Sequence, residues 1–125
     1  MNWKEWDIIS QNEQFWTSYE EKGILKAEYI KDYILELWFE DDYDVSIYEL
    51  DFSPLLIDDD PGSVFLFLKN KEYFKNVKAN HALIWDRPNE NVSVDIAPEC
   101  IRYYCEKYGK VIKEKSKKII TVQYK

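Results

Sequence analysis

Three successive segments in the first half of the chain alternate apolar and polar residues, and this period of two constrains the fold more than any other feature. The segments run from Ile24 to Ile30, from Tyr33 to Phe39 and from Val45 to Leu50. Such alternation is typical of β-strands with one buried face. With a bend near residues 31–32 and an acidic turn over residues 40–44, the three segments predict an antiparallel sheet.

The alternation also predicts which side chains face the core. In the first strand the inward residues are Leu25, Ala27 and Tyr29, and in the second they are Tyr33, Leu35, Leu37 and Phe39. Ile34, Glu36 and Trp38 then point the other way. An outward tryptophan beside an isoleucine is a candidate partner surface. The alternative, which we favour, is that the aromatic N-terminal segment from Trp3 to Tyr19 folds back and covers this face.

The second half predicts short helices followed by a second hairpin. Pro54 suits the first turn of a helix, Val64 to Leu68 has helix-like spacing, and Asn70 is a cap for another short helix. Strands follow at His81–Trp85 and Val92–Ile96, with a proline and asparagines between them. The predicted fold class is α+β, with an antiparallel sheet of two hairpins and short crossover helices.

A C-terminal helix is predicted from Ala97 to Gly109. Its apolar stripe holds Ile101, Tyr104, Cys105 and Tyr108, spaced three and four residues apart. An extra terminal strand is expected at Lys118–Tyr124. We expect one domain over residues 1–125, with a core at about 24–108. A helical extension is expected at 1–23, with its helix beginning at Asn12 and ending at Gly23. Residues 109–125 are expected to hold a basic segment and the terminal strand.

The order of several motifs resembles a known family. The motifs are Asp51-Phe52-Ser53-Pro54-Leu55-Leu56, Leu68-Lys69-Asn70 through Phe74, Ile84-Trp85-Asp86 and Asp95-Ile96-Ala97-Pro98-Glu99. Together, over residues 33–104, they resemble the small bacterial family called domain of unknown function 2442. The resemblance implies an α+β domain of unassigned activity that is more regulatory than enzymatic. Some family members carry a helix-turn-helix, for which this chain has no room.

Charge is divided unevenly along the chain. The net charge is -7 over 125 residues, with -13 in residues 1–60 and +6 in residues 61–125. The acidic balance disfavours general binding to nucleic acid or an anionic membrane. The basic segment Lys107–Lys118 leaves local nucleic-acid contact as a weaker alternative. Because residues 1–10 hold acids and tryptophans and no stretch has the ~20 apolar residues of a span, we expect a cytoplasmic protein.

No arrangement of residues in the sequence predicts catalysis or metal binding. His81 is the only histidine, and an enzyme would have to pair it with Asp86 or Asp95. Cys100 and Cys105 lie about 140° apart on one helix and are not expected to form a disulfide; Cys105 is expected in the core and Cys100 nearer the surface. We expect Asp51 and Asp95 to accept hydrogen bonds from the turns that follow them.

The sequence therefore favours a non-enzymatic protein-interaction or regulatory module without a cofactor, whose partner is another protein. The predicted partner surface consists of Ile34, Glu36, Trp38, Asp41, Asp42, Asp58, Asp59 and Asp60. Two alternatives stay open. One is an acidic mimic of nucleic acid that inhibits a basic protein, and the other is a small enzyme that uses His81 with a nearby carboxylate. Self-association into a homo-oligomer is compatible with each.

Overall fold

The alternating segments form a three-stranded antiparallel meander in the computed structural model, which describes residues 1–42, 44–56, 66–87 and 92–113. The strands are β1 (Ile24–Lys31), β2 (Ile34–Asp41) and β3 (Asp44–Asp51). A fourth strand, β7 (Lys110–Lys113), pairs antiparallel with β3 and gives the order β1-β2-β3-β7.

Strand β2 supplies the centre of the inward face as predicted. Leu35, Leu37 and Phe39 are fully buried. The prediction for Leu25 was wrong, because its side chain is 52% exposed while Ile24 is buried. The register of β1 on β2 shifts between Ile24 and Lys26, and this irregularity removes Leu25 from the inward series. A one-residue shift of this kind changes which face a side chain occupies.

A second antiparallel sheet has the order β4-β5-β6. Its strands are β4 (Lys78–Asn80), β5 (Ala82–Arg87) and β6 (Val92–Ile96). The hairpin of β5 and β6 confirms the predicted pair, whereas β4 was not predicted because three mostly polar residues carry no clear period. The two sheets meet where Ile24 and His81 exchange backbone hydrogen bonds of 2.9 and 3.2 Å.

Short helical segments connect the two sheets. They are α3 (Ser53–Leu56), the 3-10 helix η1 (Leu66–Lys69) and α4 (Lys71–Phe74). The Asn70 side chain accepts a hydrogen bond from the Glu72 amide and caps α4, as predicted. Asp51 accepts hydrogen bonds from the amide and hydroxyl of Ser53, which confirms its predicted role in the turn before α3. The α+β class is thus confirmed.

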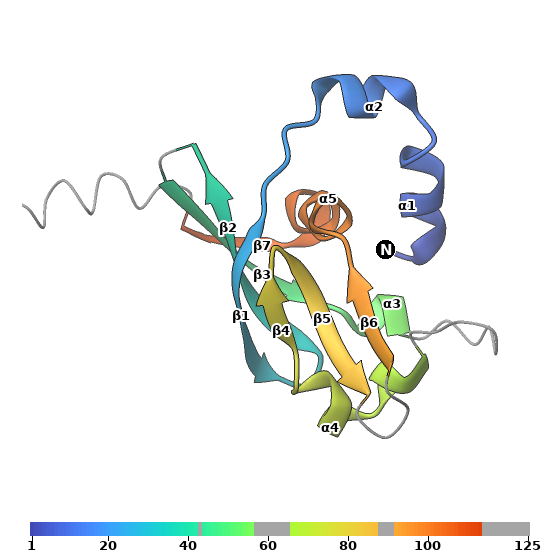
Figure 1. Cartoon of the computed structure of the whole chain (residues 1–125), viewed down its shortest axis with the longest axis vertical. Helices are drawn as coiled ribbons and strands as arrows, with labels where there is room; N and C mark the ends of the chain where they lie inside the picture. The colour runs from blue at the N-terminus through green and yellow to red at the C-terminus, as the bar shows by residue number, and fades with distance from the viewer. Residues whose placement is uncertain (43, 57–65, 88–91, 114–125) are drawn as a thin grey trace, which may run out of the picture.

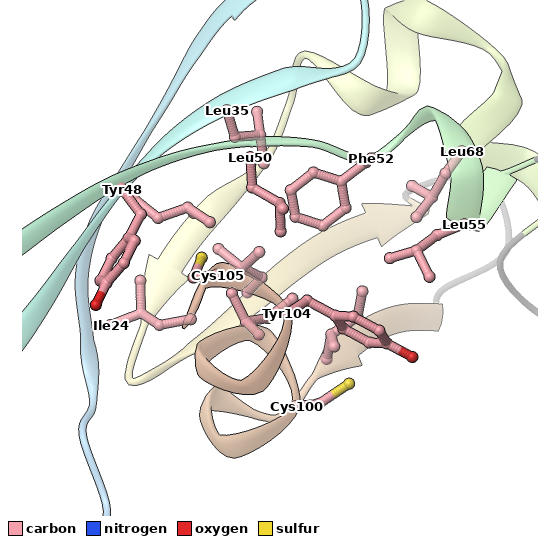
Figure 2. Packing of buried hydrophobic residues seen from close by; sticks show 14 of the residues in the cluster. Ile24, Leu35, Tyr48, Leu50, Phe52, Leu55, Leu68, Cys100, Tyr104 and Cys105 are labelled. Atoms are coloured by element: carbon pink, nitrogen blue, oxygen red, sulfur yellow. The ribbon is translucent and has the colours of Figure 1, made fainter. Parts of the chain in front are cut away.

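Helix α5 (Pro98–Tyr108) closes the core. Gly109 follows its last residue, and Ala97 precedes it without a side-chain cap, both as predicted. Figure 2 shows the Tyr104 and Cys105 side chains of α5 in one cluster with Leu50 and Phe52. Burial of side chains of this size stabilises the fold by about 1.5–3 kcal/mol each. Tyr108 was predicted in the same stripe but is 44% exposed.

The N-terminal residues form an arm beside α5, as Figure 1 shows. The arm comprises α1 (Trp3–Ile9) and α2 (Glu13–Ser18), followed by an extended stretch that leads into β1. The Asn12 cap of α2 was predicted, but α2 ends at Ser18, well before Gly23, and α1 was not predicted. Neither helix contains a fully buried residue.

The predicted role of this arm as a cover for Trp38 was wrong. The indole of Trp3 donates a hydrogen bond to the Leu55 carbonyl and packs edge-on against Tyr104. Trp6 lies 6.0 Å from the Tyr103 ring, centre to centre. The aromatic residues of the arm therefore cover α5. The predicted terminal strand at residues 118–124 lies outside the described residues, and β7 occupies part of the predicted basic segment instead.

Candidate functional site

A cavity of about 310 Å³ lies between the arm and α5. Aromatic, charged and hydroxyl side chains from the two elements line it: Phe15, Ser18, Tyr19, Glu20, Lys22, Glu99, Arg102, Tyr103 and Glu106. The size is at the lower end of that of small-molecule sites. Because the arm packs on α5 through its aromatic residues, the cavity exists only in the folded arrangement of both segments.

Arg102 provides the buried positive charge of the cavity. Its side chain is 11% exposed, its Nε atom lies 2.7 Å from Glu106, and its Nη2 atom lies 3.6 Å from Asp41. The guanidinium also stacks 5.1 Å from the ring centres of Phe39 and Tyr48. The Nη1 atom, in contrast, is buried and has no hydrogen-bond partner. A cationic donor thus keeps unused hydrogen-bonding capacity next to the cavity.

Tyr19 provides a second unused donor. Its hydroxyl is buried and forms no hydrogen bond, while its ring stacks on Phe15 with the ring centres 5.6 Å apart. Burial raises the pKa of the Tyr19 phenol, and the nearby Lys22 amide opposes this effect without reaching normal hydrogen-bond geometry. The phenol therefore stays protonated at neutral pH and remains a donor. Buried donors without acceptors are uncommon in folded proteins and call for an explanation.

Lys22, which lines the cavity, forms an ion pair with Asp41. The Lys22 ammonium lies 3.0 Å from Asp41, 3.2 Å from Glu20 and 3.4 Å from Asp42. Hydrogen bonding to Asp41 outweighs partial burial and raises the Lys22 pKa above its ordinary value. Burial alone would raise the pKa of Asp41, but hydrogen bonds from Ser46 and Lys22 hold it well below its usual range. Both groups stay charged at neutral pH.

The lining lacks two residue types that commonly act in catalysis. It contains neither histidine nor cysteine, and the Ser18 hydroxyl already donates to the carbonyls of Gln14 and Phe15. Over the described ranges 1–42, 44–56, 66–87 and 92–113, no three or more His, Cys, Asp or Glu side chains group closely enough to hold a metal ion.

The predicted partner-surface residues occupy two places. Ile34, Glu36 and Trp38 lie half-buried on the outer face of β2, opposite the core. Asp41 and Asp42 lie at the end of that strand and pair with Lys22. Asp58, Asp59 and Asp60 lie outside the described residues. The structure therefore pairs Asp41 with Lys22, a lining residue of the cavity, and keeps Trp38 on a separate surface.

Trp38 is positioned by its strand neighbours. Its indole nitrogen donates to Glu36 over 2.8 Å, and the Lys26 ammonium lies 4.8 Å from its ring centre. Ile47, directly across from Trp38 on β3, is only 4% exposed although it faces the same side.

The histidine prediction paired His81 with Asp86 or Asp95, but the structure gives it another partner. The His81 Nε2 atom lies 2.8 Å from Glu21, and its side chain is 57% exposed. Asp86 instead pairs with Lys78 at 2.8 Å, and Asp95 is exposed on β6. His81 has a positive φ of 67°, so it marks a tight backbone connection between β4 and β5.

Both cysteines are free, as expected, and both are buried. The prediction that Cys100 lies nearer the surface was wrong, because its residue is 3% exposed beneath the arm. Burial raises the pKa of both thiols well above the ordinary value. Neither is a thiolate at neutral pH, which excludes both as activated nucleophiles.

The cavity residues Tyr19, Lys22 and Arg102 were not predicted as a site. One signal was present, since Arg102 is one of only two arginines and directly follows Ile101 of the buried stripe. A long cation beside a buried stripe is a candidate for partial burial. Nothing local to Tyr19 indicated that its hydroxyl would be buried against the same helix.

No protein-family model, curated protein or solved structure matches this chain. The resemblance to domain of unknown function 2442 consequently stays a prediction. No helix among the described residues has both the length and the apolar character needed to cross a membrane.

Proposed function

We propose that this protein is a non-enzymatic regulatory binding module whose recognition site is the cavity between the arm and α5. One observation carries the proposal: the Arg102 Nη1 atom and the Tyr19 hydroxyl are buried beside this cavity without hydrogen-bond partners. Each unsatisfied donor costs about 1–3 kcal/mol. A ligand that brings a hydrogen-bond acceptor to these donors removes this free-energy penalty, which favours the bound state.

The arm is suited to admit such a ligand. Both unpaired atoms are shielded from solvent, so an acceptor reaches them when the side chains of the arm shift outward. Phe15 and Tyr19 are half-buried and are not among the residues packed against the core cluster, so a movement limited to them leaves that cluster covered. Binding then couples to the position of the arm, which is the kind of change that a regulatory module transmits. The resemblance to a family of regulatory character also supports a regulatory role.

A second candidate function is favoured by the surface around Trp38. Trp38 is held by Glu36 and Lys26, and it packs beside Ile47 on the outer sheet face. Tryptophans in such settings are common energetic centres of protein interfaces. In this candidate a partner protein places an apolar side chain against Trp38, and the cavity is not involved.

The two remaining alternatives receive less support. An acidic mimic of nucleic acid needs its carboxylates free, but Asp41 and Asp42 are paired with Lys22. An enzyme based on His81 needs a cleft, but His81 is exposed and bonded to Glu21. A cytoplasmic location also remains our proposal, because two buried free thiols suit a reducing compartment.

Chemical-shift mapping with a library of small metabolites tests the proposal. We expect at least one compound to shift the backbone amides of Tyr19, Lys22 and Arg102, and to remain chemically unchanged after prolonged incubation. The Trp38→Ala variant should retain this response. Shifts confined to residues around Trp38, or conversion of the compound, would contradict the proposal.

A further inference from the structure

The cavity makes two different chemical demands. Arg102 and Tyr19 offer hydrogen-bond donors that lack acceptors. The Glu99 carboxylate lines the same cavity and forms no hydrogen bond or ion pair with another residue in the described part of the chain. Lys22 is already paired with Asp41 and Glu20, so it does not neutralise Glu99. The cavity therefore needs a hydrogen-bond acceptor for Arg102 and Tyr19 and a cation for Glu99.

We infer that the cavity binds a free α-amino acid, an inference that rests on the proposed function. The ligand carboxylate accepts from Arg102 Nη1 and from the Tyr19 hydroxyl. Its ammonium group meets Glu99, and the Glu20 and Glu106 carboxylates also line the cavity. Charge-assisted hydrogen bonds of this type are about twice as strong as neutral ones.

The aromatic walls favour an apolar side chain on this ligand. Phe15 and Tyr103 line the cavity with their ring centres 6.3 Å apart, and both are half-buried. An aliphatic or aromatic side chain covers these rings and removes apolar surface from water, at roughly 25 cal/mol per Å². A second charged side chain on the ligand would lose its hydration there without a partner.

Simpler ligands satisfy only part of the site. The lining holds three carboxylates, of Glu20, Glu99 and Glu106, against the two cations of Lys22 and Arg102. This balance repels phosphate and other multiply charged anions. A simple amine would pair with Glu99 but would leave both donors without acceptors. A small zwitterion meets both demands, since it carries an acceptor for the donors and a cation for Glu99.

Isothermal titration of the full chain with L-phenylalanine and L-leucine tests this inference. The comparison ligands are 3-phenylpropionate, which lacks the amine, and phenethylamine, which lacks the carboxylate. We expect at least one amino acid to bind, and each comparison ligand to bind at least about tenfold more weakly, because each forfeits a charge-assisted contact. Glutamate and lysine should bind more weakly than leucine.

Two variants locate the site. Tyr19→Phe removes one unpaired donor and should weaken binding about fivefold, since one hydrogen bond contributes about 1 kcal/mol. The same change should leave the melting temperature unchanged or slightly higher, because an unsatisfied buried hydroxyl disappears. Glu99→Gln should weaken amino-acid binding and leave phenylpropionate binding unchanged. Tyr73→Phe, outside the cavity, is the matched control and should bind as the parent protein does.

The outcomes separate the inference from the proposed function. Equal affinity for phenylpropionate and phenylalanine would overturn the amino-acid assignment while keeping the cavity as an anion site. Equal affinity for phenethylamine would overturn it in favour of a cation site. Failure of all these ligands, together with no response of Tyr19 and Arg102 amides to the metabolite library, would overturn both proposals.

Discussion

The ammonium nitrogen of Lys22 lies 3.0 Å from the carboxylate of Asp41, which ties the end of the N-terminal arm to the end of β2. Asp41 also accepts a 2.7 Å hydrogen bond from the Ser46 hydroxyl and lies 3.6 Å from Arg102. One carboxylate thus holds the arm, β3 and α5 together. This relationship sets the shape of the cavity, because Lys22 and Arg102 both line it.

Asp41→Asn should destabilise the protein by about 1.5–3 kcal/mol, the range for hydrogen bonds to charged groups. The substitution removes the negative charge on which both Lys22 and Arg102 depend. Urea denaturation followed by circular dichroism measures the change. The control is Asp42→Asn, whose side chain is 80% exposed and whose substitution should alter stability by no more than about 0.5 kcal/mol. Equal effects of the two substitutions would refute the central role of Asp41.

The arm should loosen at low pH. The Tyr108 hydroxyl donates to Glu5 over 2.6 Å and Lys107 lies 3.0 Å from it, which lowers the Glu5 pKa from 4.5 to about 2 despite partial desolvation. Because the folded-state pKa is depressed, this contribution to stability is complete above pH 4.5 and is lost as the pH falls towards 2. Tryptophan fluorescence, which reports on Trp3 and Trp6, should follow this change.

Glu5→Gln is the control for the pH experiment. The variant cannot titrate at this position, so the part of the fluorescence change between pH 4.5 and 2 that is due to Glu5 should disappear. A pH profile identical to that of the parent protein would show that another group controls the arm.

Gly23→Ala should destabilise the junction between the two sheets. A Cβ atom at this position would lie 2.5 Å from the His81 Nδ1 atom and 3.1 Å from Cε1, so the imidazole that contacts Glu21 must shift away from residue 23. The backbone hydrogen bonds between Ile24 and His81 restrict how far the junction adjusts. We expect a loss of about 1–3 kcal/mol, as for other overpacked sites, measured by thermal denaturation.

A second substitution tests the cause of that loss. His81→Gly removes the ring and suits the positive φ of 67°, so the Gly23→Ala change should cost much less in the His81→Gly background than alone. Additive effects of the two changes would show that the steric explanation is incorrect.

Cys100 and Cys105 should resist alkylation in the folded protein. Both residues are buried, and burial raises the pKa of each thiol, so neither supplies a reactive thiolate at pH 8. Mass spectrometry after iodoacetamide treatment should show no labelling without denaturant and two labels per chain in urea. Rapid labelling of Cys100 under native conditions would mean that the arm opens far more often than the structure indicates.

Local patterns accounted for much of the architecture. The alternation around Leu35 and Leu37 predicted β2 and its buried face, Asn70 predicted the start of α4, and Gly109 the end of α5. These signals act over a few residues, through side-chain direction and capping hydrogen bonds, and so they can be interpreted without knowing the tertiary arrangement. The exposed position of Leu25 could not be predicted from such local signals, because a bulge depends on the partner strand.

By itself, the sequence determined the α+β class, most strand faces and the limits of α5. Only the tertiary structure decided that the arm docks on α5, leaving Trp38 uncovered by its aromatic residues and burying the Tyr19 hydroxyl beside Arg102. The reason is physical. Aromatic side chains in an amphipathic segment pack on any apolar surface of suitable shape, and the choice depends on contacts between residues far apart in the chain.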